Sequence, residues 1–192
     1  MKPKRKVISV YDNFLPPNVL EGVIKKVKSL DFYDDKKHPQ AIREKAEKDA
    51  IGEEYKMSFC GVRTESFEDV ATTTDRIILK GFESLGTSFW NKRFGYNNYA
   101  HLRLECDDSE DFIHQDPVDF AYLLYLSATN LESGTKMYSS VDEDKDNENC
   151  FVKFVQNRFV IYDALTPHMS WGNHGTDLSN GRLTINGVCE YK

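Results

Sequence analysis

The second half of the chain consists of short runs of aromatic and β-branched residues, separated by clusters of glycine, asparagine, aspartate and serine. The runs are NNYAHLRLEC, AYLLYLSA, TKMYSSV, CFVKFVQNRFVIYDA, HMSWG and RLTINGVCEY. Short runs with turn residues between them predict an antiparallel β-sandwich or β-barrel. A hairpin is predicted to turn near Gln156 and Asn157, and the acidic stretch 142–149 is predicted to be an exposed loop between strands.

The first half of the chain has a pattern that favours helices. Residues 6–12 predict a short strand, and residues 14–33 predict an amphipathic helix because apolar side chains recur there at helical spacing. Residues 34–55 are rich in lysine, glutamate and aspartate, which predicts a solvated helix or a mobile loop. A second amphipathic helix is predicted near residues 67–85. This order predicts an α+β fold that is mainly β.

Composition favours one folded domain and argues against several functions. The chain has 192 residues, of which 40% are hydrophobic, and a formal net charge of -6. We expect a single domain over residues 1–192, with the strand and helices in 1–88 and a jelly-roll core in 89–192. An acidic chain lacks the positive charge of a general nucleic-acid binder, and no apolar stretch is long enough to span a membrane. Since the N-terminus shows no secretory signal, we expect a cytoplasmic protein.

A histidine and an aspartate stand one residue apart in the segment DFIHQDPVDF. In an extended strand the side chains of His114 and Asp116 would project from the same face. His168 begins another strand-like run, and a jelly roll brings strands that are distant in sequence side by side. Two imidazoles and one carboxylate form the set of ligands that non-haem Fe(II) uses when it must keep positions open. The pair alone is a weak signal, because an HxD arises readily by chance and a polar loop is the alternative.

Arg182 and Thr184 predict a receptor for a carboxylate. In a strand they share one face, while Leu183 and Ile185 take the other. A guanidinium can bind both oxygens of a carboxylate, and a neighbouring hydroxyl adds a third donor. An arginine facing the inside of a barrel needs an anionic partner, because a buried unpaired charge is costly. The alternative is a surface arginine on an edge strand.

The order of these residues resembles that of the Fe(II)- and 2-oxoglutarate-dependent dioxygenases, in particular the prolyl-hydroxylase-like branch. The resemblance covers roughly residues 96–190 and includes the segments IHQDP, YLLYLS, ESGTKMY and NRFVIYDALTPHMS, followed by Arg-x-Thr. It implies a double-stranded β-helix, which is a jelly-roll or cupin-like barrel, with N-terminal supporting helices. It also implies Fe(II) held by His114, Asp116 and His168, and 2-oxoglutarate held through its far carboxylate by Arg182, Thr184 and Tyr125.

The resemblance implies a hydroxylase that couples the oxidative decarboxylation of 2-oxoglutarate by O2 to oxidation of a C–H bond, with ascorbate as a candidate further cofactor. The segment RLECDDSEDF departs from the family, because it lacks the tyrosine and glycine often found there. One side of the co-substrate pocket therefore stays unassigned. His101 and His174 are expected not to bind the metal, with His174 the one rival to His168.

The substrate is predicted less sharply, as either a small molecule or a protein or peptide. Acidic residues near the HxD disfavour phosphodiesters and favour a neutral or cationic substrate, such as a prolyl or lysyl side chain or a free amino acid. Arg63, in a strand-like piece expected to lie outside the barrel, is a candidate substrate-binding residue, with a structural ion pair as the alternative. Two other functions stay open: a cupin-like metal-binding protein without 2-oxoglutarate chemistry, and a non-enzymatic jelly-roll interaction module.

Overall fold

The structure is a computed structural model that describes residues 8–55, 59–66, 94–107, 111–172 and 174–191. The helix predicted near residues 67–85 lies outside the described residues. Neither described helix is long and apolar enough to cross a membrane.

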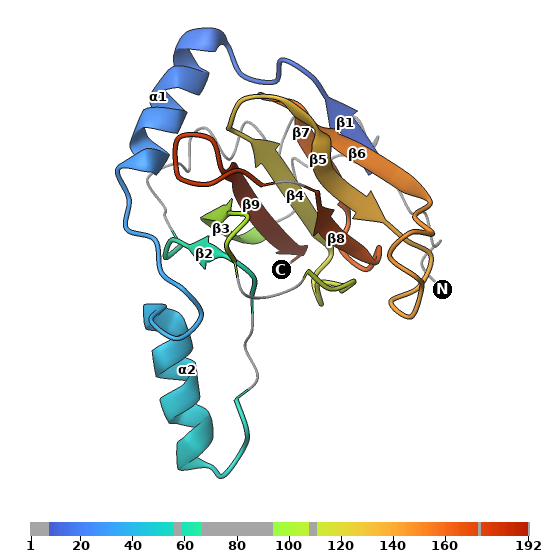
Figure 1. Cartoon of the computed structure of the whole chain (residues 1–192). Helices are drawn as coiled ribbons and strands as arrows, with labels where there is room; N and C mark the ends of the chain where they lie inside the picture. Colours follow the sequence, from blue (N-terminus) through green and yellow to red (C-terminus); the bar gives the residue numbers. More distant parts are fainter. Residues whose placement is uncertain (1–7, 56–58, 67–93, 108–110, 173, 192) are drawn as a thin grey trace.

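Two antiparallel sheets form the body of the described part of the chain (Figure 1). In spatial order, the larger sheet contains β1 (Ile8–Tyr11), β7 (Phe159–Asp163), β4 (Phe120–Tyr125), β9 (Arg182–Tyr191), β3 (Phe94–Arg103) and β2 (Val62–Arg63). The smaller sheet contains β6 (Cys150–Phe154), β5 (Asn130–Met137) and β8 (His168–Trp171). These strands confirm the predicted runs, since each described strand after residue 93 overlaps one of them.

The strands of the larger sheet alternate apolar side chains between its two faces. On β9, Leu183 and Ile185 join a core cluster with α1, whereas Arg182 and Thr184 are buried on the opposite face. This alternation follows from the two-residue period of a strand and confirms the predicted shared face of Arg182 and Thr184. A second cluster lies between the two sheets and contains side chains from both, among them Tyr125, Met137, Val152, Phe154, Val160 and Tyr162.

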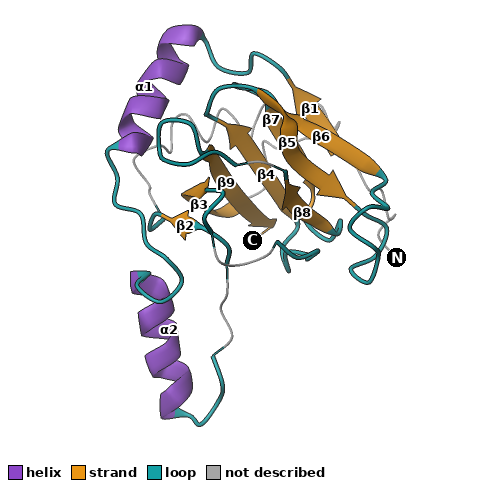
Figure 2. Cartoon of the chain, in the orientation of Figure 1, coloured by secondary structure: helices purple, strands orange, loops and turns teal. Residues whose placement is uncertain are grey.

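Helix α1 (Pro17–Lys28) covers the outer face of the larger sheet (Figure 2). Pro17 begins the helix, where a missing N–H costs nothing, and Val23 and Val27 face the sheet. The helix is shorter than the predicted 14–33, because Ser29 caps it. Helix α2 (Pro39–Ala50) forms in the charged region, which confirms a solvated helix there over a loop. It buries little apart from Ala41 and stands away from the sheets.

The hairpin predicted near Gln156 and Asn157 is wrong, because β6 belongs to the smaller sheet and β7 to the larger one, so the chain crosses between the sheets there. Asn157 forms the turn of this connection and also holds the N-terminal segment against it. Its backbone has a φ of 62°. Its side chain donates to the carbonyl oxygen of Leu15 at 2.8 Å and accepts from the N–H of Leu15 at 2.9 Å. Asn157 therefore adopts a left-handed backbone conformation, which asparagine tolerates better than most residues, and its side chain makes two hydrogen bonds to the backbone of Leu15.

We expect Asn157→Gly to lower the free energy of unfolding by about 1 to 3 kcal/mol, because it removes two buried hydrogen bonds but keeps the turn. Asn157→Ala should cost about 1 kcal/mol more, because alanine is strained at this φ. Urea titration followed by circular dichroism measures both. Equal stabilities of wild type and Asn157→Gly would show that the two hydrogen bonds to Leu15 contribute nothing to the free energy of unfolding.

Candidate metal and co-substrate site

His114, Asp116 and His168 lie together, as the sequence predicted. One possible ligand atom from each lies within 4.8 Å of the others, and Nε2 of His168 is 3.6 Å from Oδ2 of Asp116. Ligand atoms that are each about 2 Å from one ion are separated by roughly 3 to 4 Å, so small side-chain adjustments would bring all three onto a cation. Within the described residues, no other group of histidine, cysteine and acidic side chains meets this condition.

Both histidines are oriented by backbone carbonyls. Nδ1 of His114 is 3.0 Å from the carbonyl oxygen of Phe112, and Nδ1 of His168 is 2.9 Å from that of Thr166. A proton on each Nδ1 can make these bonds, which leaves the Nε2 lone pair free for a metal. Burial lowers the pKa of His168 to about 4, so its ring is neutral at pH 7. Neutral imidazole is the form that binds metal.

The segment that carries the first two residues is not a strand, which corrects the prediction. His114 forms an isolated bridge with His168, through hydrogen bonds of 3.0 and 2.9 Å between their backbones. The N–H of Asp116 then donates to the carbonyl oxygen of Ala164 at 3.0 Å. The HxD and the distal histidine are therefore placed next to each other by direct pairing of their own backbones.

A cavity of about 230 Å³ adjoins this cluster. Its wall includes the three side chains and, from β9, Arg182. The guanidinium of Arg182 is buried and donates to Oγ1 of Thr135 at 3.2 Å, but its Nε has no hydrogen-bond partner. Burial lowers the pKa of this guanidinium, which shows how poorly its charge is solvated. An unsatisfied buried cation of this kind fits an anionic ligand in the cavity.

Tyr125 and Thr184 lie behind the cavity wall. The hydroxyl of Tyr125 is 2.7 Å from Oγ1 of Thr135, and the hydroxyl of Thr184 donates to Oδ1 of Asn186 at 2.5 Å. Thr135 and Asn186 are part of the wall itself. Direct contact of Tyr125 and Thr184 with a co-substrate stays a prediction, and Thr135 is a site residue that the sequence reasoning missed.

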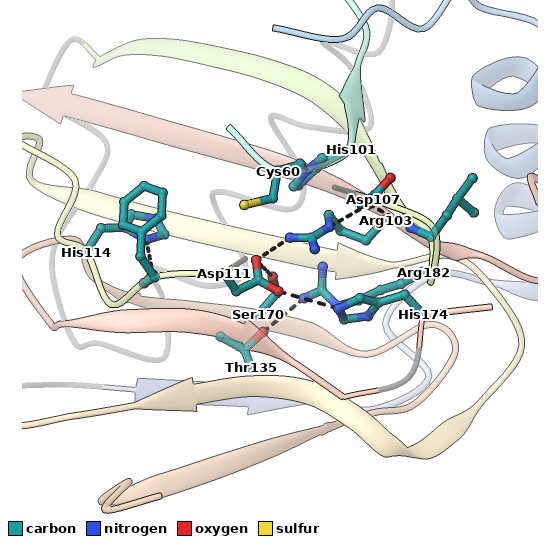
Figure 3. Close-up of polar contacts among 12 residues, drawn as sticks. Cys60, His101, Arg103, Asp107, Asp111, His114, Thr135, Ser170, His174 and Arg182 are labelled. Atoms are coloured by element: carbon teal, nitrogen blue, oxygen red, sulfur yellow. Dashed lines mark hydrogen bonds and ion pairs between the residues drawn. The ribbon is translucent and has the colours of Figure 1, made fainter. Parts of the chain in front are cut away.

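Asp107 and Asp111, two acidic residues before His114, belong to an ion-pair network (Figure 3). Arg103 bonds to Oδ2 of Asp107 at 2.8 Å and also pairs with Asp111. Asp111 accepts from the hydroxyl of Ser170 at 2.6 Å and lies 3.5 Å from Nε2 of His174. Asp107 and Asp111, two of the acidic residues behind the expectation of a neutral or cationic substrate, thus share one arginine, which offsets part of their charge. That expectation stays a prediction.

His174 and His101 have partners outside the metal cluster. His174 contacts Asp111, and Nε2 of His101 is 2.6 Å from the carbonyl oxygen of Cys60. Burial lowers the pKa of both rings, so both are neutral at pH 7. Neither is part of the three-residue cluster found in the described chain.

Asp111→Asn is expected to lower the free energy of unfolding by about 2 kcal/mol at pH 7. Burial alone would raise the pKa of Asp111, but hydrogen bonds from His174 and Ser170 and the charge of Arg103 lower it to about 2. The folded pKa lies below the usual value of 3.8, so this stabilisation is present above pH 4 and is lost as the pH falls toward 2. Urea titrations at pH 7 and pH 3 measure it.

Asp142→Asn, in the exposed acidic loop, makes the same chemical change without burial and should leave stability within about 0.5 kcal/mol. If Asp111→Asn behaves like this control at pH 7, the network does not stabilise the fold.

Comparison with solved structures finds proteins of similar overall fold. A prolyl-4-hydroxylase from Pseudomonas putida matches with a TM-score of 0.55 and 13% identity, over 97% of this chain and 94% of that one. HygX from Streptomyces hygroscopicus, solved with nickel, 2-oxoglutarate and hygromycin B bound, matches with a TM-score of 0.61 and 8% identity, over 96% and 83%. A Trichoplax adhaerens prolyl hydroxylase in complex with a hypoxia-inducible factor peptide matches with a TM-score of 0.59 and 14% identity, over 96% and 82%.

The chain shares the fold of these proteins. This likeness confirms one part of the fold that the sequence resemblance implied. The protein is mainly antiparallel β, and the described residues also include two helices. No family model matches the chain, and no curated protein matches it in sequence.

Arg63 lies elsewhere than predicted. Its strand, β2, pairs with β3 and forms the edge of the larger sheet, so it is not outside the β unit. Arg63 lines the cavity beside His114, Asp116 and His168 and also a wider groove of about 760 Å³ that reaches α2. Its guanidinium packs on the rings of Phe59 and Tyr99, at 4.3 and 4.8 Å from the ring centroids. No ion pair involves it within the described residues, so the alternative of a structural ion pair has no support there.

Proposed function

We propose that this protein is an Fe(II)- and 2-oxoglutarate-dependent oxygenase that hydroxylates a C–H bond of an amino acid or a protein side chain. The observation that carries the proposal is that His114, Asp116, His168 and Arg182 line one cavity. A facial set of two imidazoles and a carboxylate suits Fe(II), and a buried guanidinium in the same cavity suits a dicarboxylate.

The chain's own residues have distinct roles in this proposal. His114, Asp116 and His168 would hold Fe(II), which with O2 and 2-oxoglutarate supplies the oxidising chemistry. Arg182 would hold the far carboxylate, with Thr135 fixing its guanidinium through the 3.2 Å hydrogen bond. Tyr125 and Thr184 would support the residues that line the cavity. Tyr125 would do so by orienting the hydroxyl of Thr135.

We interpret the two sheets as a double-stranded β-helix, and the described elements as parts of one domain over residues 1–192. The cavity between the metal cluster and Arg182 would hold the co-substrate away from bulk water. The wider groove shares His114 and Asp116 with this cavity and would receive the substrate. Its size admits either a small molecule or a peptide.

The proposal is tested by incubating the full chain with Fe(II), 2-oxoglutarate, ascorbate and O2, and measuring succinate release across free amino acids and proline-containing peptides. We expect succinate to form only with both Fe(II) and 2-oxoglutarate present, and to increase with one class of substrate. No succinate under any of these conditions, and no stabilisation by 2-oxoglutarate, would favour a cupin-like metal protein. A protein that retains no metal at all would favour an interaction module.

A further inference from the structure

Arg63 and Arg182 line different parts of the cavity wall. In the sheet, Arg63 on β2 lies opposite His101 on β3, and His101 lies opposite Thr184 on β9. Arg63 is therefore two strand spacings away from β9, the strand that carries Arg182. Two spacings are about 10 Å. Arg63 also lines the outer groove, whereas Arg182 does not. The two guanidiniums therefore lie at different ends of the space formed by the cavity and the outer groove.

Aromatic packing holds the guanidinium of Arg63 in place without neutralising it. The rings of Phe59 and Tyr99 contact it, and its Nε is buried without a hydrogen-bond partner. Stacking leaves the in-plane N–H groups of a guanidinium free to donate, which is the arrangement used to bind carboxylates in a forked geometry. A fixed, unsatisfied donor at the cavity mouth is poorly explained by packing alone.

Lys48, the other basic side chain among the described residues that line the groove, already has an acidic partner. Lys48 pairs with Glu53, and Glu44 accepts from Gln40 and from the hydroxyl of Tyr55. Arg63 has no carboxylate at ion-pair distance among the described residues. Arg63 is therefore the basic side chain of the groove with no carboxylate partner among the described residues, although Glu44, Glu54 and Asp116 place negative charge on the same groove wall.

We propose that Arg63 binds a carboxylate of the substrate and so selects acidic substrates. The inference deepens the proposed function and rests on it, since 2-oxoglutarate would occupy Arg182 and leave Arg63 for the second reactant. It differs from the expectation of a neutral or cationic substrate, and Arg103, which pairs with both Asp107 and Asp111, offsets part of the negative charge on which that expectation rested. The carboxylate has two sources, the α-carboxylate of a free acid or the side chain of an acidic residue in a peptide.

The test uses the full chain loaded with Zn(II), which is redox-inactive, and saturated with 2-oxoglutarate. Two matched probe pairs are titrated and followed by ligand-observed NMR: N-acetylalanine against its amide, and N-acetylglutamate N-methylamide against its glutamine counterpart. We expect the acid of one pair to bind about tenfold tighter than its neutral partner, which is typical for a hydrogen bond to a charged group. The pair that discriminates identifies the source of the carboxylate.

Arg63→Gln should abolish this discrimination while leaving the affinity for 2-oxoglutarate within about twofold. Arg63→Lys should retain part of it, because it keeps the charge but loses the fork. Arg43→Gln, which removes an exposed arginine of α2, is the matched control and should retain all of it. The inference is overturned if neither acid outcompetes its neutral partner, or if Arg63→Gln keeps the discrimination.

A loss of 2-oxoglutarate affinity in Arg63→Gln would also overturn the inference, because it would assign Arg63 to the co-substrate. If Arg63→Gln does not fold, the wild-type comparison and Arg63→Lys still decide. Failure of the proposed function is seen separately, as an absence of Zn(II) or 2-oxoglutarate binding in the wild type.

Discussion

His114→Ala is expected to reduce Fe(II) affinity at least 100-fold and to abolish 2-oxoglutarate turnover. The substitution removes one of the three proposed ligands, and loss of a group that only orients a ligand already costs about 10- to 100-fold. His114 is only partly buried, so its removal should disturb the fold less than removal of His168. Metal content after dialysis against Fe(II) under anaerobic conditions, with succinate release on the same samples, measures both effects.

Gln115→Ala is the matched control for metal binding, because Gln115 lies between the two ligands in sequence and donates to the carbonyl oxygen of Leu165 at 2.5 Å. It should retain wild-type metal content. Wild-type metal content in His114→Ala would show that the cluster is not the metal site. Equal losses in both variants would instead point to disruption of the whole segment.

Arg182→Met is expected to weaken 2-oxoglutarate binding at least 100-fold without lowering the stability of the ligand-free protein. Removing one partner of a buried charge pair costs about 2 to 5 kcal/mol. In the ligand-free protein the same guanidinium is buried with an unsatisfied Nε, so an apolar side chain of similar length should be neutral or stabilising there. Thermal unfolding with and without 2-oxoglutarate, on metal-loaded protein, measures both effects.

Arg158→Met is the control for this substitution. Arg158 bonds to the carboxylate of Asp12 at 2.6 and 2.9 Å, away from the cavity. It should lower stability by about 1 kcal/mol or less, because its ion pair is partly exposed, and it should leave the shift caused by 2-oxoglutarate unchanged. An undiminished shift in Arg182→Met would contradict the co-substrate assignment.

The parts of the fold with strong periodic patterns were predictable from the sequence. The strands are short and aromatic, and β9 alternates so regularly that the shared face of Arg182 and Thr184 follows from spacing alone. The length of α1 was overpredicted because apolar residues continue past Lys28, where the helix ends. For α2 the sequence left helix and loop open, because a chain segment with almost no buried side chains gives no periodic signal.

The close approach of His114, Asp116 and His168 was predictable from the sequence, but the way the backbone brings them together was not. The HxD motif and the order of the later segments identified the three residues, yet the backbone pairing of His114 with His168 is a long-range contact that no local pattern encodes. The same holds for Thr135 and for the pairing of Asp111 with Arg103, because their roles depend on which strands become neighbours. The position of β2 at the sheet edge was missed for the same reason.

The central claim is that one cavity binds Fe(II) and 2-oxoglutarate together, and anaerobic titration tests it most directly. Fe(II)-loaded wild type titrated with 2-oxoglutarate should show saturable binding at one equivalent per chain and the visible charge-transfer absorption of a 2-oxo acid chelated to Fe(II). The absorption should be missing in His114→Ala and should require far more 2-oxoglutarate in Arg182→Met. Binding of 2-oxoglutarate that is independent of Fe(II), or no such absorption in the wild type, would contradict the account.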